Sequence, residues 1–374
     1  MTPIFSLRRG LTLALAAWAW GGACQQGIGA PQSQAQPAAS QRAVVIVSGG
    51  DAVSPFTTPG GACRIGFAAG NTDTELRRFL LLKGHRVFTS PAMDDRGPVR
   101  ENPGPDPLMA FADCPPALPP SMTVNSTGDI DLAGQRLAQF LLYLHRQYGI
   151  REVDLVGHSM GGLYSRAALP ALRDLGNPVR IRSLTTLGTP WQGAVVGDYV
   201  IGKRSLADCY GNRFCELFLQ SFKPLADGLV SGSGQQGSYQ YLQVPRPHGG
   251  GWNQAQVGQL NGIPVSLIGG AWFQAPKGVQ ADPLMYPWDG LVSKASALAV
   301  NVSDSVLPHR RCLALPLTHS IFVSAKFSGK PVPDPADFNN ALTWNPKALA
   351  AVETALQQAD TALTTPNRQG CPNP

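Results

Sequence analysis

The residues best suited to chemistry are a serine and its flanking glycines, in Gly157-His158-Ser159-Met160-Gly161. A G-x-S-x-G pattern forms a nucleophile elbow when it lies between a strand and a helix. Both are expected here, because residues 152–156 are apolar and β-branched and residues 163–169 favour a helix. The glycines allow close backbone approaches in the turn, and the helix N-terminus directs partial positive charge at the serine. The pattern therefore predicts Ser159 as a nucleophile.

A serine nucleophile needs a general base within hydrogen-bond reach, and that base needs an acid to orient it. Among the six histidines, His319 directly follows the stretch 313–318 at the end of a predicted strand. Ligands of open α/β sheets bind at the carboxyl ends of the strands, so His319 is the favoured base. The other candidates lie at strand starts, on the polar side of a helix, inside the elbow or in a glycine-rich stretch: His85, His145, His158, His248 and His309.

The favoured orienting acid is Asp289, which lies between two predicted strands and is followed by Gly290. A glycine beside the acid permits a tight turn. Asp282, seven residues earlier, is the competing candidate. The chain order Ser159, Asp289, His319 is the order expected for α/β-hydrolases and differs from that of other serine hydrolases.

A tetrahedral intermediate also needs backbone N–H donors for its oxyanion, each worth roughly 10²–10³ in rate. One donor is expected from Met160, directly after the nucleophile. The other is expected from the loop after the strand 43–47, where Gly50 is preferred and Asp51 is the alternative.

The elements that must position these residues alternate between buried strands and helices. With 374 residues and 43% hydrophobic residues, the chain suits one large α/β domain with insertions. Strands are predicted at 43–47, 86–89, 152–156, 181–187, 264–268 and 311–317, and helices at 73–83, 131–148, 163–169 and from 345 to about 363, with Asp131 and Asn345 as caps. This pattern predicts a mostly parallel sheet with helices on both faces.

Three segments interrupt or follow this pattern. Residues 91–127 form a long loop rich in proline and glycine. Residues 191–262 lack a sheet-forming period and are interpreted as an inserted cap, with an aromatic helix at 215–225. The hydrolase domain is placed at residues 43–365, and a C-terminal tail at 366–374.

The stretches 155–162, 187–193 and 289–292 resemble the bacterial triacylglycerol lipase/esterase branch of the α/β-hydrolase superfamily. The resemblance spans roughly residues 43–325. It implies an α/β-hydrolase fold with an inserted cap, and ester hydrolysis through an acyl-enzyme with Ser159, Asp289 and His319 as the triad. The chain departs from the family at Ser48-Gly49, where the family has His-Gly, and it lacks the calcium-ligand aspartates of some of these lipases.

The N-terminus reads as an export signal over residues 1–23, with two arginines before an apolar stretch at 11–20. Gly21-Gly22-Ala23 before Cys24 resembles a bacterial lipobox, although Gly21 stands where leucine is usual. Residues 24–42 have the composition of a flexible tether. We expect an exported protein that is held at a membrane by a lipidated Cys24. The alternative is ordinary signal cleavage, which would give a secreted or periplasmic protein.

Cysteine usage agrees with export. An oxidising compartment favours disulfides, and six of the seven cysteines follow the predicted tether, which leaves Cys24 over. Six cysteines allow 15 pairings. Proximity in the sequence favours Cys63 with Cys114, Cys209 with Cys215, and Cys312 with Cys371. No cysteine or histidine spacing is typical of a zinc site, so we expect neither a metal nor another cofactor.

The net charge of +6 comes from scattered basic residues without interleaved aromatic residues, so nucleic-acid binding is not expected. The expected partner is an ester or lipid substrate. The leading hypothesis is an exported serine carboxylester hydrolase of the lipase/esterase type. An acyltransferase or polyester hydrolase with the same triad and a non-catalytic surface lipoprotein are the alternatives. The acyl chain length and the oligomeric state are not encoded in these motifs.

Overall fold

The computed structural model describes residues 41–94, 98–103, 110–222, 233–244, 251–327, 335–361 and 367–372. The predicted signal, Cys24, most of the predicted tether and His248 lie outside these ranges.

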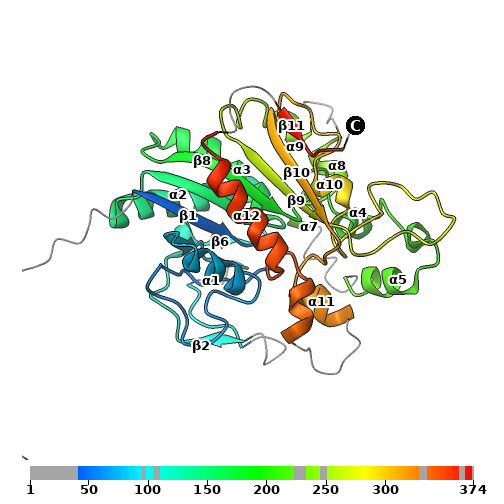
Figure 1. Cartoon of the computed structure of the whole chain (residues 1–374), viewed down its shortest axis with the longest axis horizontal. Helices are drawn as coiled ribbons and strands as arrows, with labels where there is room; N and C mark the ends of the chain where they lie inside the picture. The colour runs from blue at the N-terminus through cyan, green and yellow to red at the C-terminus, as the bar shows by residue number, and fades with distance from the viewer. Residues whose placement is uncertain are drawn as a thin grey trace, which may run out of the picture. The chain divides into compact units, whose positions relative to one another are not determined.

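Seven parallel strands form the central sheet in the order β11-β10-β9-β8-β7-β1-β3 (Figure 1). Val45 of β1 lies beside Leu155 of β7, and Ile46 lies beside Val156. Strands that are buried on both faces read as continuous apolar runs, which is why their positions could be predicted. The strands are β1 (Arg42–Val47), β3 (Val87–Thr89), β7 (Glu152–His158), β8 (Arg180–Leu187), β9 (Val265–Gly270), β10 (His309–Leu315) and β11 (Asn367–Gln369).

Helices cover both faces of this sheet (Figure 1). Val45 and Leu155 point into a core formed with α2 (Ile130–Tyr148) and α3 (Gly161–Asp174). Ile46 and Val156 point into a second core with α1 (Thr74–Leu82) and α12 (Pro346–Gln358). Because side chains alternate along each strand, the strands contribute residues to the cores on both faces of the sheet. The prediction of a parallel sheet wrapped on both sides is confirmed.

The start of α2 and the end of α12 differ from the predictions. The N-cap of α2 is Asp129, whose side chain accepts the N–H of Leu132 at 2.9 Å. The predicted cap, Asp131, is in the first turn and accepts the indole N–H of Trp252 at 3.0 Å. α12 begins as predicted, with Asn345 as its cap and proline at its first position, but it ends at Gln358.

Three disulfides tie the loops and the sheet edge, and they are the predicted pairs: Cys63–Cys114, Cys209–Cys215 and Cys312–Cys371. The first joins the segment before α1 to the predicted loop 91–127, which holds the short strands β4 (Ala92–Met93), β5 (Phe111–Ala112) and β6 (Val124–Asn125) and the short 3₁₀ helix η2 (Pro120–Met122). β5 pairs with β2 (Ile65–Gly66), and β4 pairs with β6.

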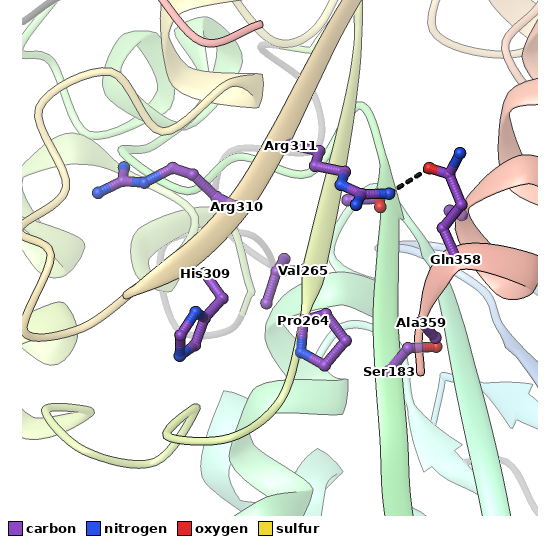
Figure 2. A pocket seen from close by; sticks show the side chains of 10 residues that line it. Ser183, Pro264, Val265, His309, Arg310, Arg311, Gln358 and Ala359 are labelled. Carbon is purple, nitrogen blue, oxygen red and sulfur yellow. Dashed lines mark hydrogen bonds between the residues drawn. The ribbon is translucent and has the colours of Figure 1, made fainter. Parts of the chain in front are cut away.

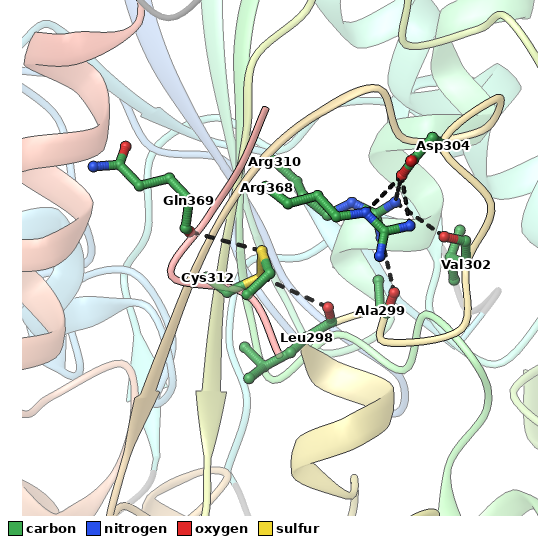
Figure 3. The surroundings of a disulfide bond; sticks show 9 residues. Leu298, Ala299, Val302, Asp304, Arg310, Cys312, Arg368 and Gln369 are labelled. Atoms are coloured by element: carbon green, nitrogen blue, oxygen red, sulfur yellow. Dashed lines mark hydrogen bonds and ion pairs between the residues drawn. A yellow bond between two sulfur atoms is a disulfide. The ribbon is translucent and has the colours of Figure 1, made fainter. Parts of the chain in front are cut away.

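The strand β11 was not predicted, because its residues were assigned to a tail. It pairs in parallel with β10, and the bond Cys312–Cys371 joins the two segments (Figure 3). Beside this bond, Arg310 and Arg368 converge on Asp304, with a distance of 2.7 Å from Arg368 to the carboxylate. A three-residue strand shows too little periodicity to be recognised in the sequence, so covalent and ionic contacts distinguish it from a tail.

The described residues between β8 and β9 form short helices: α4 (Val195–Val200), η3 (Leu206–Cys209), α5 (Arg213–Gln220), α7 (Ser233–Gln236), α8 (Tyr239–Leu242) and α9 (Trp252–Ala255). α5 begins two residues before its predicted start and ends five before its predicted end. Its side chain Phe218 packs in a cluster with Phe273 and Trp288. By contrast, Trp252 belongs to the core against α2 and α3. The segment therefore contributes both to the Phe218 cluster and to the main core, and its role as a cap stays a prediction.

The remaining helices, α10 (Lys294–Ala297), α11 (Ile321–Phe327) and η5 (Pro335–Asn340), follow β9 and β10. In the part of the chain that the structure describes, no helix is both long and apolar enough to cross a membrane.

Candidate active site

The turn between β7 and α3 has the geometry of a nucleophile elbow. Ser159 has a φ of +54°, a left-handed conformation that non-glycine residues rarely adopt outside strained sites. A Cβ atom on Gly157 would lie 2.5 Å from the backbone nitrogen of Gly162, and one on Gly161 would lie 2.1 Å from the carbonyl oxygen of Val47. Both positions therefore require glycine, as the sequence indicated. The turn presents Ser159 at the carboxyl end of β7.

Asp289 and His319 lie side by side, although thirty residues separate them. The Nδ1 atom of His319 is 2.8 Å from Oδ2 of Asp289, and both side chains are buried. Oδ1 of Asp289 accepts the backbone N–H groups of Leu291 at 2.9 Å and Val292 at 2.7 Å. The carboxyl group of Asp289 thus engages Nδ1 of His319, and Nε2 is the ring nitrogen that remains for proton transfer.

The Nε2 atom of His319 is buried and makes no hydrogen bond within the described residues. His319 and Ser159 line the same cavity, which has a volume of about 450 Å³. A general base must come within hydrogen-bond reach of the serine hydroxyl, and bonds of this kind often tighten only when substrate binds. The structure thus brings the three predicted triad residues to one site.

The loop after β1 packs directly on the nucleophile. A Cβ atom on Gly49 would lie 2.4 Å from Cβ of Ser159, so the backbone approaches as closely as a glycine allows. Asp51 donates its N–H to the carbonyl oxygen of Ser126 at 3.1 Å and is therefore engaged elsewhere. The N–H groups of Gly50 and Met160 have no acceptor among the described residues. Of the predicted oxyanion donors, this geometry favours Gly50 and Met160 over Asp51.

His158, to which the sequence assigned no role, contacts the candidate base. Its Nε2 donates to the carbonyl oxygen of His319 at 2.9 Å, and the two ring centroids are 4.8 Å apart. Burial, together with the neighbouring His319, lowers the pKa of His158 to about 3, so this ring stays neutral. The sequence carried no signal for this contact, because it forms only when the loop after β10 meets the elbow.

The other candidates are engaged away from the elbow. The carboxylate of Asp282 accepts a hydrogen bond from the guanidinium group of Arg204 at 2.7 Å, so it is engaged with a different partner from His319. His85 is 2.6 Å from a carboxylate oxygen of Glu353, and Nδ1 of His145 is 2.8 Å from the carbonyl oxygen of Ile150. His309 is the first residue of β10, at the opposite end of the strand from the site.

The cavity at Ser159 has two chemically different walls. One wall is apolar and comes from α5 and the residues just after it, α11 and the loop beside Asp289; it comprises Phe218, Phe222, Leu291, Phe322 and Val323. The other wall is polar and comprises Asp51, Asn71, Thr72 and Asn102. Phe218 and Phe222 belong to the aromatic stretch 215–225 of the predicted cap. Phe322 and the polar residues were missed because the segments that carry them become neighbours only in the fold.

A second hollow lies at the amino ends of β9 and β10 and is far too small for an ester. Figure 2 shows Pro264, Val265 and His309 around it, with Arg311 bonded to Gln358. Its volume of about 20 Å³ holds roughly one water molecule. Among the described residues, no group of three or more histidine, cysteine or acidic side chains could hold a metal ion.

Comparison with known proteins supports the same class of enzyme. Residues 121–204, which contain the elbow, match the family model described as "Putative serine esterase (DUF676)". The mature lipase of Bacillus licheniformis is 17% identical, with a TM-score of 0.33 over 72% of this chain and 83% of that chain. A Listeria innocua protein is 16% identical, with a TM-score of 0.39 over 88% of this chain and 98% of that chain.

A lipase-esterase related protein of Clostridium acetobutylicum is 12% identical, with a TM-score of 0.37 over 86% of this chain and 96% of that chain. At these values the superpositions carry no argument of their own. The match of residues 121–204 and the wrapped parallel sheet confirm the predicted resemblance at the level of esterase-like hydrolases with an α/β-hydrolase fold. The narrower bacterial lipase branch remains a prediction.

Proposed function

We propose that this protein is an exported serine carboxylester hydrolase that works through an acyl-enzyme. The observation that carries the proposal is the pair of Asp289 and His319: His319 lines the same cavity as Ser159, and its Nε2 atom makes no hydrogen bond within the described residues. Three disulfides support an oxidising compartment and hence export.

In the proposed first half-reaction, the hydroxyl oxygen of Ser159 attacks the ester carbonyl and its proton passes to Nε2 of His319. Asp289 remains ionised and stabilises the imidazolium that forms. The N–H groups of Gly50 and Met160 bind the developing oxyanion. The alcohol then leaves with the proton from His319, and the acyl group stays on Ser159.

In the second half-reaction, water gives a proton to His319 and attacks the acyl carbonyl of the acyl-enzyme. The bond to the serine oxygen then breaks, the acid is released, and His319 returns the proton to Ser159. We assign the apolar wall of Phe218, Phe222 and Phe322 to the acyl chain, because burial of hydrocarbon on aromatic surface favours binding. No metal or other cofactor takes part in this scheme.

The test of the nucleophile is Ser159→Ala in the full chain, assayed on p-nitrophenyl esters and with a fluorophosphonate probe. We expect loss of labelling and a fall in kcat of several orders of magnitude, with unchanged circular dichroism. Near-normal activity of this variant would refute the assignment, and a wild-type protein that neither labels nor hydrolyses would indicate a binding protein.

The test of the acid uses a matched pair of carboxylates. Asp289→Asn should inactivate the enzyme, because an asparagine favours the wrong tautomer of His319. His319→Ala should inactivate it as well, whereas Asp282→Asn should retain activity, because that carboxylate pairs with Arg204. If Asp282→Asn is the inactive variant, the acid is misplaced. Product analysis with an added alcohol acceptor separates hydrolysis from acyl transfer.

A further inference from the structure

A carboxylate is buried behind the loop that approaches Ser159. Asp73, the residue before α1, has no exposed surface and does not line the cavity. The hydroxyl of Ser48 donates to its Oδ2 atom, and the hydroxyls of Ser54 and Thr72 lie 3.3 Å and 3.4 Å from the carboxylate. Within the described residues, no ion pair reaches it. A buried carboxylate whose only hydrogen-bond partners are hydroxyl groups lowers the stability of the fold. This cost suggests that Asp73 has a role other than stabilisation.

Burial raises the pKa of Asp73 to about 6, although the three hydroxyl bonds act in the opposite direction. The carboxylate is therefore mostly ionised at neutral pH. A hydrogen bond to an ionised acceptor is roughly twice as strong as one between neutral groups. The ionised carboxylate thus holds the Ser48 side chain, which is itself fully buried, in one orientation.

Ser48 connects this carboxylate to the reaction centre. It directly precedes Gly49, whose backbone packs against Ser159. The far end of the loop is held by the N–H of Asp51 on the carbonyl oxygen of Ser126 at 3.1 Å. Gly50 lies between these two anchors, and its N–H has no acceptor among the described residues. Ser48 also occupies the position where the lipase resemblance has histidine.

We propose that Asp73 is a positioning residue that acts through Ser48 to hold the oxyanion loop, residues 48–51, with the N–H of Gly50 directed at the reacting carbonyl. The proposal rests on the ester hydrolysis proposed above. Asp73 touches no substrate. Its effect should fall on the transition state, because oxyanion donors act on the charge that develops there.

The experiment compares Asp73→Ala, Ser48→Ala and the double variant in the full chain, with a short p-nitrophenyl ester. Removal of a whole donor lowers kcat by roughly 10²–10³, so a displaced donor should lower it between about tenfold and a hundredfold, with KM within about twofold of wild type. The double variant should be no slower than the slower single variant, because both substitutions break one link. Asp73→Asn keeps an oxygen acceptor for Ser48 and should recover most of the lost kcat.

The matched control is Thr57→Val, which removes another buried hydroxyl bond, from Thr57 to Thr89 at 2.7 Å. This variant should keep the wild-type kcat even if its melting temperature falls. Asp73→Ala with a wild-type kcat, additive losses in the double variant, or an equal loss in Thr57→Val would overturn the proposal. If Ser159→Ala stays active, the proposed function fails instead, and the two failures are distinguishable.

Discussion

Replacement of Asp73 by asparagine should stabilise the protein at alkaline pH and leave its stability unchanged at acid pH. The pKa of this buried carboxyl group is raised from its ordinary 3.8 to about 6 in the folded state. Between these values the folded state binds more protons than the unfolded state, so stability falls as the pH rises toward 6. Each pKa unit corresponds to about 1.4 kcal/mol, so the ionised carboxylate destabilises the folded state by about 3 kcal/mol above pH 7. Asparagine resembles the neutral carboxyl group, so the Asp73→Asn variant lacks this destabilisation.

The assay is urea unfolding of both proteins at pH 4 and pH 8, followed by the fluorescence of the seven tryptophans. We expect a variant that is more stable by about 3 kcal/mol at pH 8 and of similar stability at pH 4. The other buried carboxylates with a raised pKa, Asp154 and Asp198, are present in both proteins and cancel in the difference. A variant that is less stable at pH 8, or that gains equally at both pH values, would refute this reasoning.

Three further predictions concern the site and the N-terminus. Gly49→Ala should lower kcat and the rate of fluorophosphonate labelling by about a hundredfold. The added Cβ atom would lie 2.4 Å from the Cβ atom of Ser159, so it must displace the loop or the nucleophile. Labelling at the wild-type rate would contradict the close packing. Phe218→Ser and Phe222→Ser should each shift the substrate preference toward short acyl chains in a p-nitrophenyl ester series, because both side chains line the apolar wall. An equal loss of activity on all esters, together with a lower melting temperature, would indicate that the side chain belongs to the core. Cys24→Ser should move the protein from the detergent phase to the aqueous phase in extracts of the native host. The variant loses the lipid anchor, of which each buried CH₂ group contributes ~0.8 kcal/mol to membrane binding. If wild type and variant both stay in the aqueous phase, the protein is secreted without a lipid anchor.

The amino-acid sequence by itself determined the features that depend on near neighbours. Six of the seven strands of the main sheet were predicted, and β1 was the clearest, because a strand covered on both faces reads as a continuous apolar run. The elbow was recognisable because its glycines are required within five residues of chain. The cap of α12 was also local, with Asn345 before a proline. The disulfide pairs followed from proximity alone, which succeeded because each bond joins cysteines that follow one another along the chain.

Only the tertiary structure distinguishes the surroundings of the candidates that the sequence left open. Asp282 and Asp289 look alike in the sequence, and the fold gives one to Arg204 and the other to His319. Likewise, Asp51 loses its N–H to the carbonyl of Ser126, which leaves Gly50 as the free donor.

The contacts around the nucleophile show the same division. The hydrogen bond from His158 to the carbonyl oxygen of His319 joins segments that are distant in sequence. The hydrogen bond from the Ser48 hydroxyl to Asp73 joins the loop after β1 to the start of α1. Periodicity and spacing report which face of an element is buried, but they contain no information on which partner meets it. That choice depends on how the strands are ordered in the sheet, and it sets the hydrogen bonds on which the chemistry of this site rests.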